Sequence, residues 1–164
     1  MHTEPIHNKD ILLVEDDSHD AELALAALED GLANRVAVVN NGAEALDFLY
    51  RRGQFHMRAG GNPIIVLLDN KMPKVSGLEV LKVIKGDRRL KIIPVVALTS
   101  SRRTQDLIEF YEHGVNAYVV KPLDFSEFRA AIKQLVAFWA KVNQPPPTGR
   151  EETLYLSEEL VTTG

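Results

Sequence analysis

The chain has 164 residues, of which 45% are hydrophobic, and a formal net charge of -4. This length suits one domain with a sizeable core, and the negative charge argues against nucleic acid as a direct partner. The absence of cysteine excludes disulfides and thiolate metal sites, and the absence of a long apolar run predicts a cytoplasmic protein with no membrane contact.

Five short apolar runs, rich in β-branched residues, predict β-strands. The run at 64–68 shows no polar alternation, which is typical of a strand covered on both faces in a parallel sheet. Helical patterns lie between the runs, so we expect an α/β fold with a doubly wound, five-stranded parallel sheet. The predicted strands are residues 11–14, 36–39, 64–68, 92–98 and 117–120, and the predicted helices are residues 20–30, 43–52, 77–85, 104–113 and 125–141.

The chain is predicted to consist of an arm at residues 1–8, one folded domain at 9–143, and a tail at 144–164 that is ordered only where something docks it. Three prolines at 145–147 end the last predicted helix. About twenty residues are too few for a DNA-binding output domain, so the tail is not expected to supply one.

Two other segments have an open interpretation. Residues 53–62 make a connection of about ten residues where about four to six is usual, which fits either a plain surface loop or an interaction loop. Near the end of the last predicted helix, Trp139 is expected to pack in the core. Phe138 is left open between the core and a partner surface.

Chemically reactive side chains follow four of the five predicted strands. They are Glu15, Asp16 and Asp17 after the first strand, Asp69 after the third, Thr99 and Ser100 after the fourth, and Lys121 and Pro122 after the fifth. The carboxyl ends of parallel strands share one rim of a sheet, so we expect these residues to converge there. The result would be an acidic pocket that faces a hydroxyl and an amine.

Carboxylates brought together at neutral pH repel one another unless a cation lies among them, and Mg²⁺ prefers oxygen ligands. Glu15, Asp16 and Asp69, with a backbone carbonyl from the loop after Asp69, are the predicted ligands. An aspartate can attack phosphorus, and Asp69 is the predicted acceptor because it follows the most apolar strand, which is expected at the sheet centre. Lys121 would pair with Asp69 before the reaction and, like the Thr99 hydroxyl, with phosphoryl oxygens after it.

Each motif has an ordinary structural explanation when it occurs alone. Glu-Asp-Asp after a strand is usually a solvated cap, Thr-Ser a helix N-cap and Lys-Pro a turn. Their joint occurrence, in order along the chain, favours phosphoryl transfer onto Asp69. A cis Lys121–Pro122 bond would aim Lys121 inward, but the sequence leaves the isomer open.

On these residues the chain resembles the receiver domain of two-component response regulators, over residues 9–142. The four motifs are Asp10-Ile-Leu-Leu-Val-Glu-Asp-Asp17, Leu67-Leu-Asp-Asn-Lys-Met-Pro73, Val95-Val-Ala-Leu-Thr-Ser100 and Ala117-Tyr-Val-Val-Lys-Pro122. The resemblance implies a flavodoxin-like (βα)₅ fold with strand order 2-1-3-4-5. It also implies that Asp69 accepts a phosphoryl group from a histidine kinase.

The resemblance carries further roles onto matching positions. It implies metal binding for Glu15, Asp16, Asp69 and the Lys71 carbonyl, contact with the phosphoryl group for Thr99 and Lys121, and a switch role for Tyr118. The chain departs from the commonest pattern at Glu15, which replaces an aspartate, and at Lys71, whose side chain could alter water access to the acyl phosphate. The long loop, the end of the last helix and the short tail resemble single-domain regulators paired with bacterial phytochrome kinases.

The implied protein is a signalling switch and not an enzyme. Its expected partners are a sensor histidine kinase, such as a phytochrome, and a downstream protein target or phosphotransfer protein. A homodimer through the face formed by residues 104–113 to 125–141, and through the tail, is also expected. Two alternatives remain: a constitutive scaffold with an unused pocket, and a haloacid-dehalogenase-type phosphohydrolase, which would need an aspartate where Lys71 stands.

Overall fold

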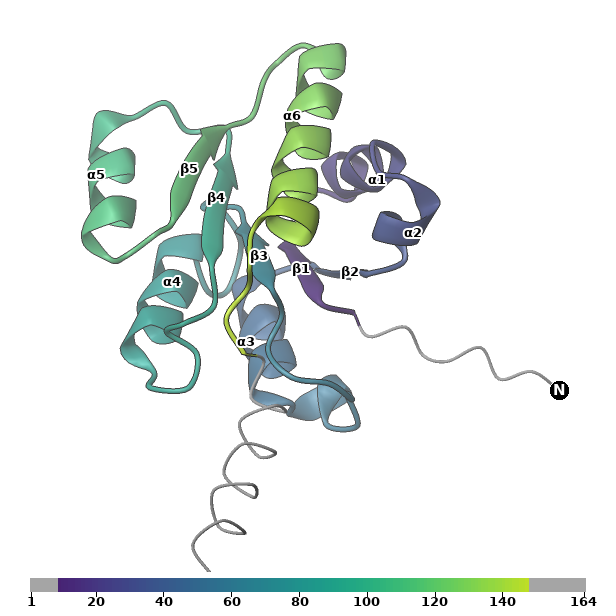
Figure 1. Ribbon diagram of the computed structural model, residues 1–164. Coiled ribbons are helices and arrows are strands. Elements are labelled where there is room, and N and C mark those ends of the chain that lie inside the picture. The colour runs from purple at the N-terminus through teal and green to yellow at the C-terminus, as the bar shows by residue number, and fades with distance from the viewer. Residues whose placement is uncertain (1–8, 148–164) are drawn as a thin grey trace, which may run out of the picture.

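The computed structural model describes residues 9–147 and contains one five-stranded sheet with helices on both faces (Figure 1). The strands are β1 (Ile11–Val14), β2 (Val36–Val39), β3 (Ile65–Leu68), β4 (Val95–Thr99) and β5 (Ala117–Val120). All four pairings are parallel, and the order across the sheet is β2-β1-β3-β4-β5. The predicted fold class and strand order are confirmed.

The fourth strand begins later than the predicted run at 92–98. Pro94 has no backbone N–H to donate to a sheet ladder, so β4 starts at Val95. The residues before it form a turn in which the Ile93 N–H donates to the Leu90 carbonyl at 2.9 Å. The Pro94 carbonyl still accepts from the Val66 N–H at 2.9 Å, which aligns the incoming chain beside β3.

Within residues 9–147, six α-helices separate and flank the strands, where the sequence predicted five. They are α1 (Ser18–Ala26), α2 (Asp30–Ala33), α3 (Gly42–Tyr50), α4 (Gly77–Gly86), α5 (Thr104–Glu112) and α6 (Phe125–Ala137), with short turns η1 (Gly53–Phe55) and η2 (Phe138–Val142). The prediction of one helix at 20–30 was wrong, because extended backbone at Glu29 separates α1 from α2. The start was also wrong, since the Asp17 carboxylate accepts from the N–H groups of His19 and Asp20 and caps a helix that begins at Ser18.

The helices form two layers with one hydrophobic core on each side of the sheet (Figure 1). Helices α3, α4 and α5 pack on one face, and α1, α2 and α6 pack on the other. Strand β3 is buried along its whole length, as its uninterrupted apolar sequence predicted. Trp139 is partly buried against the core beside α6, whereas Phe138 is 47% exposed.

The long connection at 53–62 is tied to α3. The Arg58 guanidinium donates to the carbonyls of Phe48 at 2.9 Å and Gly61 at 3.0 Å, and it lies 4.2 Å from the centre of the Phe48 ring. Phe55 packs edge-on against the same ring. The connection is therefore an anchored surface loop.

The predicted arm at 1–8 and residues 148–164 of the predicted tail lie outside the described residues. The domain limits at 9 and 143 therefore stay predictions. Within residues 9–147, no helix is both long enough and apolar enough to span a membrane.

Candidate functional site

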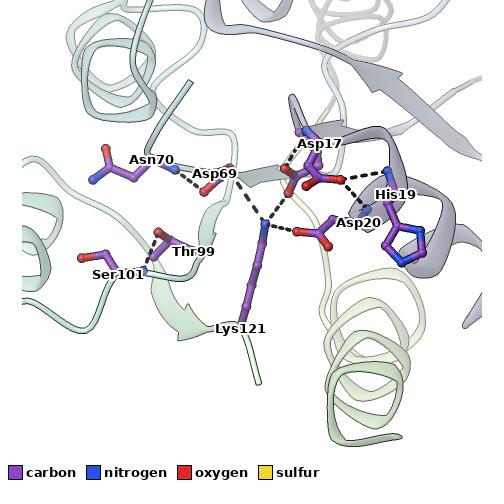
Figure 2. A network of polar contacts seen from close by, with 9 residues as sticks. Asp17, His19, Asp20, Asp69, Asn70, Thr99, Ser101 and Lys121 are labelled. Carbon is purple, nitrogen blue, oxygen red and sulfur yellow. Dashed lines mark hydrogen bonds and ion pairs between the residues drawn. The ribbon is translucent and has the colours of Figure 1, made fainter. Parts of the chain in front are cut away.

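The predicted site residues come together at the carboxyl-terminal rim of the sheet (Figure 2). Glu15 follows β1, Asp69 follows β3, Thr99 ends β4 and Lys121 follows β5. Glu15, Asp69 and Thr99 are buried, with 3%, 8% and 1% of their surface exposed. Residues up to 106 positions apart in the sequence are thus in contact, as the parallel strand order requires.

Three carboxylates form a cluster on this rim. Glu15, Asp16 and Asp69 each contribute one oxygen, and these oxygens all lie within 4.8 Å of one another. Asp16 is exposed, so the cluster opens to solvent on its side. Asp17 does not join the cluster, because its carboxylate caps α1.

Lys121 reaches the cluster from the end of β5. The prediction paired it with Asp69, but two other carboxylates lie closer to its ammonium. Its Nζ lies 2.6 Å from Glu15 Oε2, 3.1 Å from Asp20 Oδ2 and 3.8 Å from Asp69 Oδ2. The predicted pairing with Asp69 therefore exists only as the longest of three contacts. Asp20, in the first turn of α1, was missed by the sequence analysis. The one signal for it is that the Asp17 cap fixes the start of α1 and turns that first turn toward the rim.

The Lys121–Pro122 bond is trans, since the described residues contain no cis peptide bond. Lys121 nonetheless points inward, toward the carboxylates of Glu15, Asp20 and Asp69 (Figure 2). An inward lysine in this loop does not require a cis proline.

The cluster carries more negative charge than its surroundings neutralise. Burial raises the pKa of Glu15 to about 7, although the hydrogen bond from Lys121 opposes this and the charge of Asp69 adds to it. Burial also raises the pKa of Asp69, against the lowering effect of Lys121. The pKa of Lys121 is lowered by burial, but the bond to Glu15 and the charge of Asp69 outweigh burial and raise it overall. Carboxylates in this state would gain from a second cation.

Hydrogen bonds hold the loop after Asp69 close to the end of β3. The Asn70 N–H donates to Asp69 Oδ1 at 2.8 Å, and the Gly77 N–H donates to the Asn70 carbonyl at 2.9 Å. A side chain at Gly77 would overlap the Asp69 carbonyl, so glycine is required where α4 begins. Lys71 lies in this loop with an exposed side chain, and metal binding by its carbonyl stays a prediction.

Thr99 and Tyr118 meet at a residue that the sequence analysis did not single out. The Ser101 N–H donates to Thr99 Oγ1 at 3.1 Å, and the Tyr118 hydroxyl donates to the Ser101 carbonyl at 3.3 Å. The Tyr118 ring packs edge-on against Phe110 of α5, with 5.6 Å between ring centres. The sequence named Ser100, the other serine of this motif, which is exposed.

This arrangement of acids, lysine and threonine on a parallel five-stranded sheet agrees with the comparison to known families. The family described as the response regulator receiver domain matches residues 11–133. The chain belongs to this family. The resemblance drawn from the four motifs is thereby confirmed.

Relatives of this receiver domain include regulators associated with phytochromes. Response regulator Rcp1 of Synechocystis is 35% identical over 80% of this chain and 88% of its own. The solved bacteriophytochrome response regulator RtBRR is 50% identical over 93% of each chain, with a TM-score of 0.65. The phosphorylated cyanobacterial phytochrome response regulator RcpA is 35% identical over 85% of this chain and 99% of its own, with a TM-score of 0.79.

Proposed function

We propose that this receiver accepts a phosphoryl group on Asp69 from a histidine kinase and thereby changes its affinity for protein partners. The observation that carries the proposal is the position of Asp69. It lies at the end of the central strand, 3.8 Å from the Lys121 ammonium and within 4.8 Å of the acids Glu15 and Asp16. RcpA, to which the chain is similar, was solved in a phosphorylated form.

The residues present fit a divalent cation. Glu15, Asp16 and Asp69 offer three converging oxygens, and burial raises the pKa values of Glu15 and Asp69, an effect that a nearby cation would oppose. Oxygen ligands of this kind suit Mg²⁺. When bound, the ion would reduce repulsion between the acceptor and an incoming phosphoryl group. Rcp1 was solved in a Mn²⁺-bound form, and that structure matches 84% of this chain with a TM-score of 0.75.

The chain's own residues then have separate tasks. One carboxylate oxygen of Asp69 forms the new P–O bond while the P–N bond to the donor histidine breaks, and the electron pair returns to the imidazole. Lys121 is within a short movement of Asp69 and supplies positive charge to the phosphoryl oxygens. Thr99 Oγ1 accepts from Ser101, which leaves its hydroxyl proton for a phosphoryl oxygen.

The proposed output is a protein surface. Helix α5 exposes Leu107, Ile108 and Tyr111, at 36%, 49% and 53% of their surface, and lies beside β5 (Figure 1). The proposed partners are a sensor histidine kinase of the phytochrome type, because RtBRR and RcpA are phytochrome regulators, and a downstream protein target. A homodimer through this face and the exposed Phe138 belongs to the same proposal.

The two alternatives differ in chemistry. A phosphohydrolase of the haloacid-dehalogenase type would need an aspartate as its general acid at position 71, where this chain has lysine. A constitutive scaffold would not need Lys121 turned toward three carboxylates. Neither alternative explains the site as fully as phosphate acceptance.

The test is phosphotransfer from a panel of purified, radiolabelled histidine kinases, together with a small-molecule phosphodonor. We expect Mg²⁺-dependent labelling of the wild-type chain and none of Asp69→Asn. Asp17→Asn is the matched control, because Asp17 is an acid of the same motif that caps α1 outside the cluster. An unlabelled wild-type chain with every donor, or equal labelling of Asp69→Asn, would refute the proposal.

A further inference from the structure

Ser101 joins three parts of the molecule through its own hydrogen bonds. Its N–H donates to Thr99 Oγ1, its carbonyl accepts from the Tyr118 hydroxyl, and its Oγ donates to the Asp106 carboxylate in the first turn of α5. The same Oγ accepts from the Arg103 N–H at 3.3 Å. Ser101 is 6% exposed, so it has little room to move independently of these partners.

Helix α5 has few other attachments to the sheet. Phe110 is the one buried residue among the nine of α5, whereas α4 buries four of its ten. The N-cap residue Arg103 makes no side-chain cap, so the start of the helix depends on Ser101 and Asp106. A helix with so little buried apolar surface costs little free energy to displace.

We propose that Ser101 and Asp106 are positioning residues that couple the phosphorylation site to α5. This inference rests on the proposed function. When the Thr99 hydroxyl turns to a phosphoryl oxygen, the Ser101 N–H loses or follows its acceptor, and the buried Ser101 moves with it. The bond from Ser101 Oγ to Asp106 transmits that movement to the first turn of α5. The carbonyl of Ser101 releases or redirects Tyr118 in the same displacement.

A plain helix cap would use some of the same bonds, so the two roles must be separated. Asn41 accepts from the Glu44 N–H at 2.9 Å and caps α3, and it has no bond to Thr99 or Tyr118. Asn41→Ala therefore removes an ordinary N-cap of similar energetic worth. A cap alone would predict that Ser101→Ala and Asn41→Ala have the same kind of effect, namely a loss of stability with no change in the response of α5.

The experiment records amide ¹H–¹⁵N spectra of the full chain with Mg²⁺, before and after a beryllofluoride titration. In the wild type we expect shifts at Asn70 and Lys71, beside the acceptor, and along α5. In Ser101→Ala and Asp106→Ala the shifts near the acceptor persist, while those of α5 are largely lost. Ser101→Thr keeps the hydroxyl and restores the α5 response. Asn41→Ala leaves it intact.

Each outcome has one meaning. Undiminished α5 shifts in Ser101→Ala and Asp106→Ala overturn this inference and leave the proposed function standing. Equal loss in Asn41→Ala also overturns it, because the effect would then be one of general stability. A wild type with no shift at Asn70 or Lys71 overturns both the proposed function and the coupling.

Discussion

Replacing Glu15 with glutamine changes how the stability of the metal-free protein depends on pH. The pKa of Glu15 rises from 4.5 to about 7 because the carboxyl is buried, with 3% of its side chain exposed. The folded protein therefore binds this proton more tightly than the unfolded chain does. Stability falls as the pH rises from about 4.5 to about 7, and the full cost remains above that interval.

The size of the effect follows from the same pKa. Each pKa unit corresponds to about 1.4 kcal/mol, so ionised Glu15 costs roughly 3 kcal/mol of folding free energy at pH 8. Glu15→Gln cannot ionise and escapes this cost. The free energy of unfolding of the variant, relative to the wild type, should rise by up to about 3 kcal/mol between pH 4.5 and pH 8.

The assay is urea denaturation at pH 4.5, 6, 7 and 8 in the presence of a chelator. Glu22→Gln, on the exposed side of α1, is the control for loss of a surface carboxylate. Adding Mg²⁺ at pH 8 should stabilise the wild type more than Glu15→Gln, because the ion relieves the repulsion that the variant lacks. A stability difference between variant and wild type that stays constant from pH 4.5 to 8 would show that the reasoning about this buried carboxyl is wrong.

Three further substitutions test the packing of α4 and α5. Gly77→Ala forces the loop away from the Asp69 carbonyl, at an overpacking cost of about 1–3 kcal/mol in folding free energy. The variant should be labelled on Asp69 more slowly than the wild type, and labelling at the wild-type rate would contradict this. Phe110→Ala removes the one buried side chain of α5 and should cost about 3–5 kcal/mol by urea denaturation, with a smaller loss counting against its anchoring role. The Lys85 ammonium donates to the carbonyls of Lys91 and Ile93 and to Asn116 Oδ1. Lys85→Met removes this shared donor and should lower the free energy of unfolding by about 1–3 kcal/mol. An unchanged thermal melt would mean that water replaces the ammonium.

Much of the architecture could be predicted from the sequence. Uninterrupted apolar runs such as β3 occur in strands that are covered on both faces, and turn residues separate these runs from helical patterns. These two features predicted a parallel sheet with the site residues along one of its edges. The clustering of Glu15, Asp16 and Asp69 followed from topology alone. The strand boundary at Pro94 was missed although the physical reason was visible in the sequence.

The partners of individual side chains could not be predicted in this way. Lys121 has a long side chain, and the strand order fixes where it starts but not which of three nearby carboxylates its ammonium contacts. Asp20 became a partner because Asp17 caps α1 and turns its first helical turn toward the rim. Ser101 was overlooked for a similar reason. Neither its burial nor its four hydrogen-bonded partners can be read from the short motif Thr-Ser-Ser.

Helix α5, which connects β4 to β5, is held less firmly than the central strand of the sheet. Asp69 extends from a strand whose every residue is enclosed, whereas α5 buries only the Phe110 side chain and is joined to the end of β4 by the hydrogen bond from Ser101 to Asp106. Sequence changes on the outer surface of α5 can therefore accumulate without disturbing phosphate chemistry. Under the proposed function, a receiver built this way can acquire new partner proteins over evolutionary time while the reaction at Asp69 stays the same.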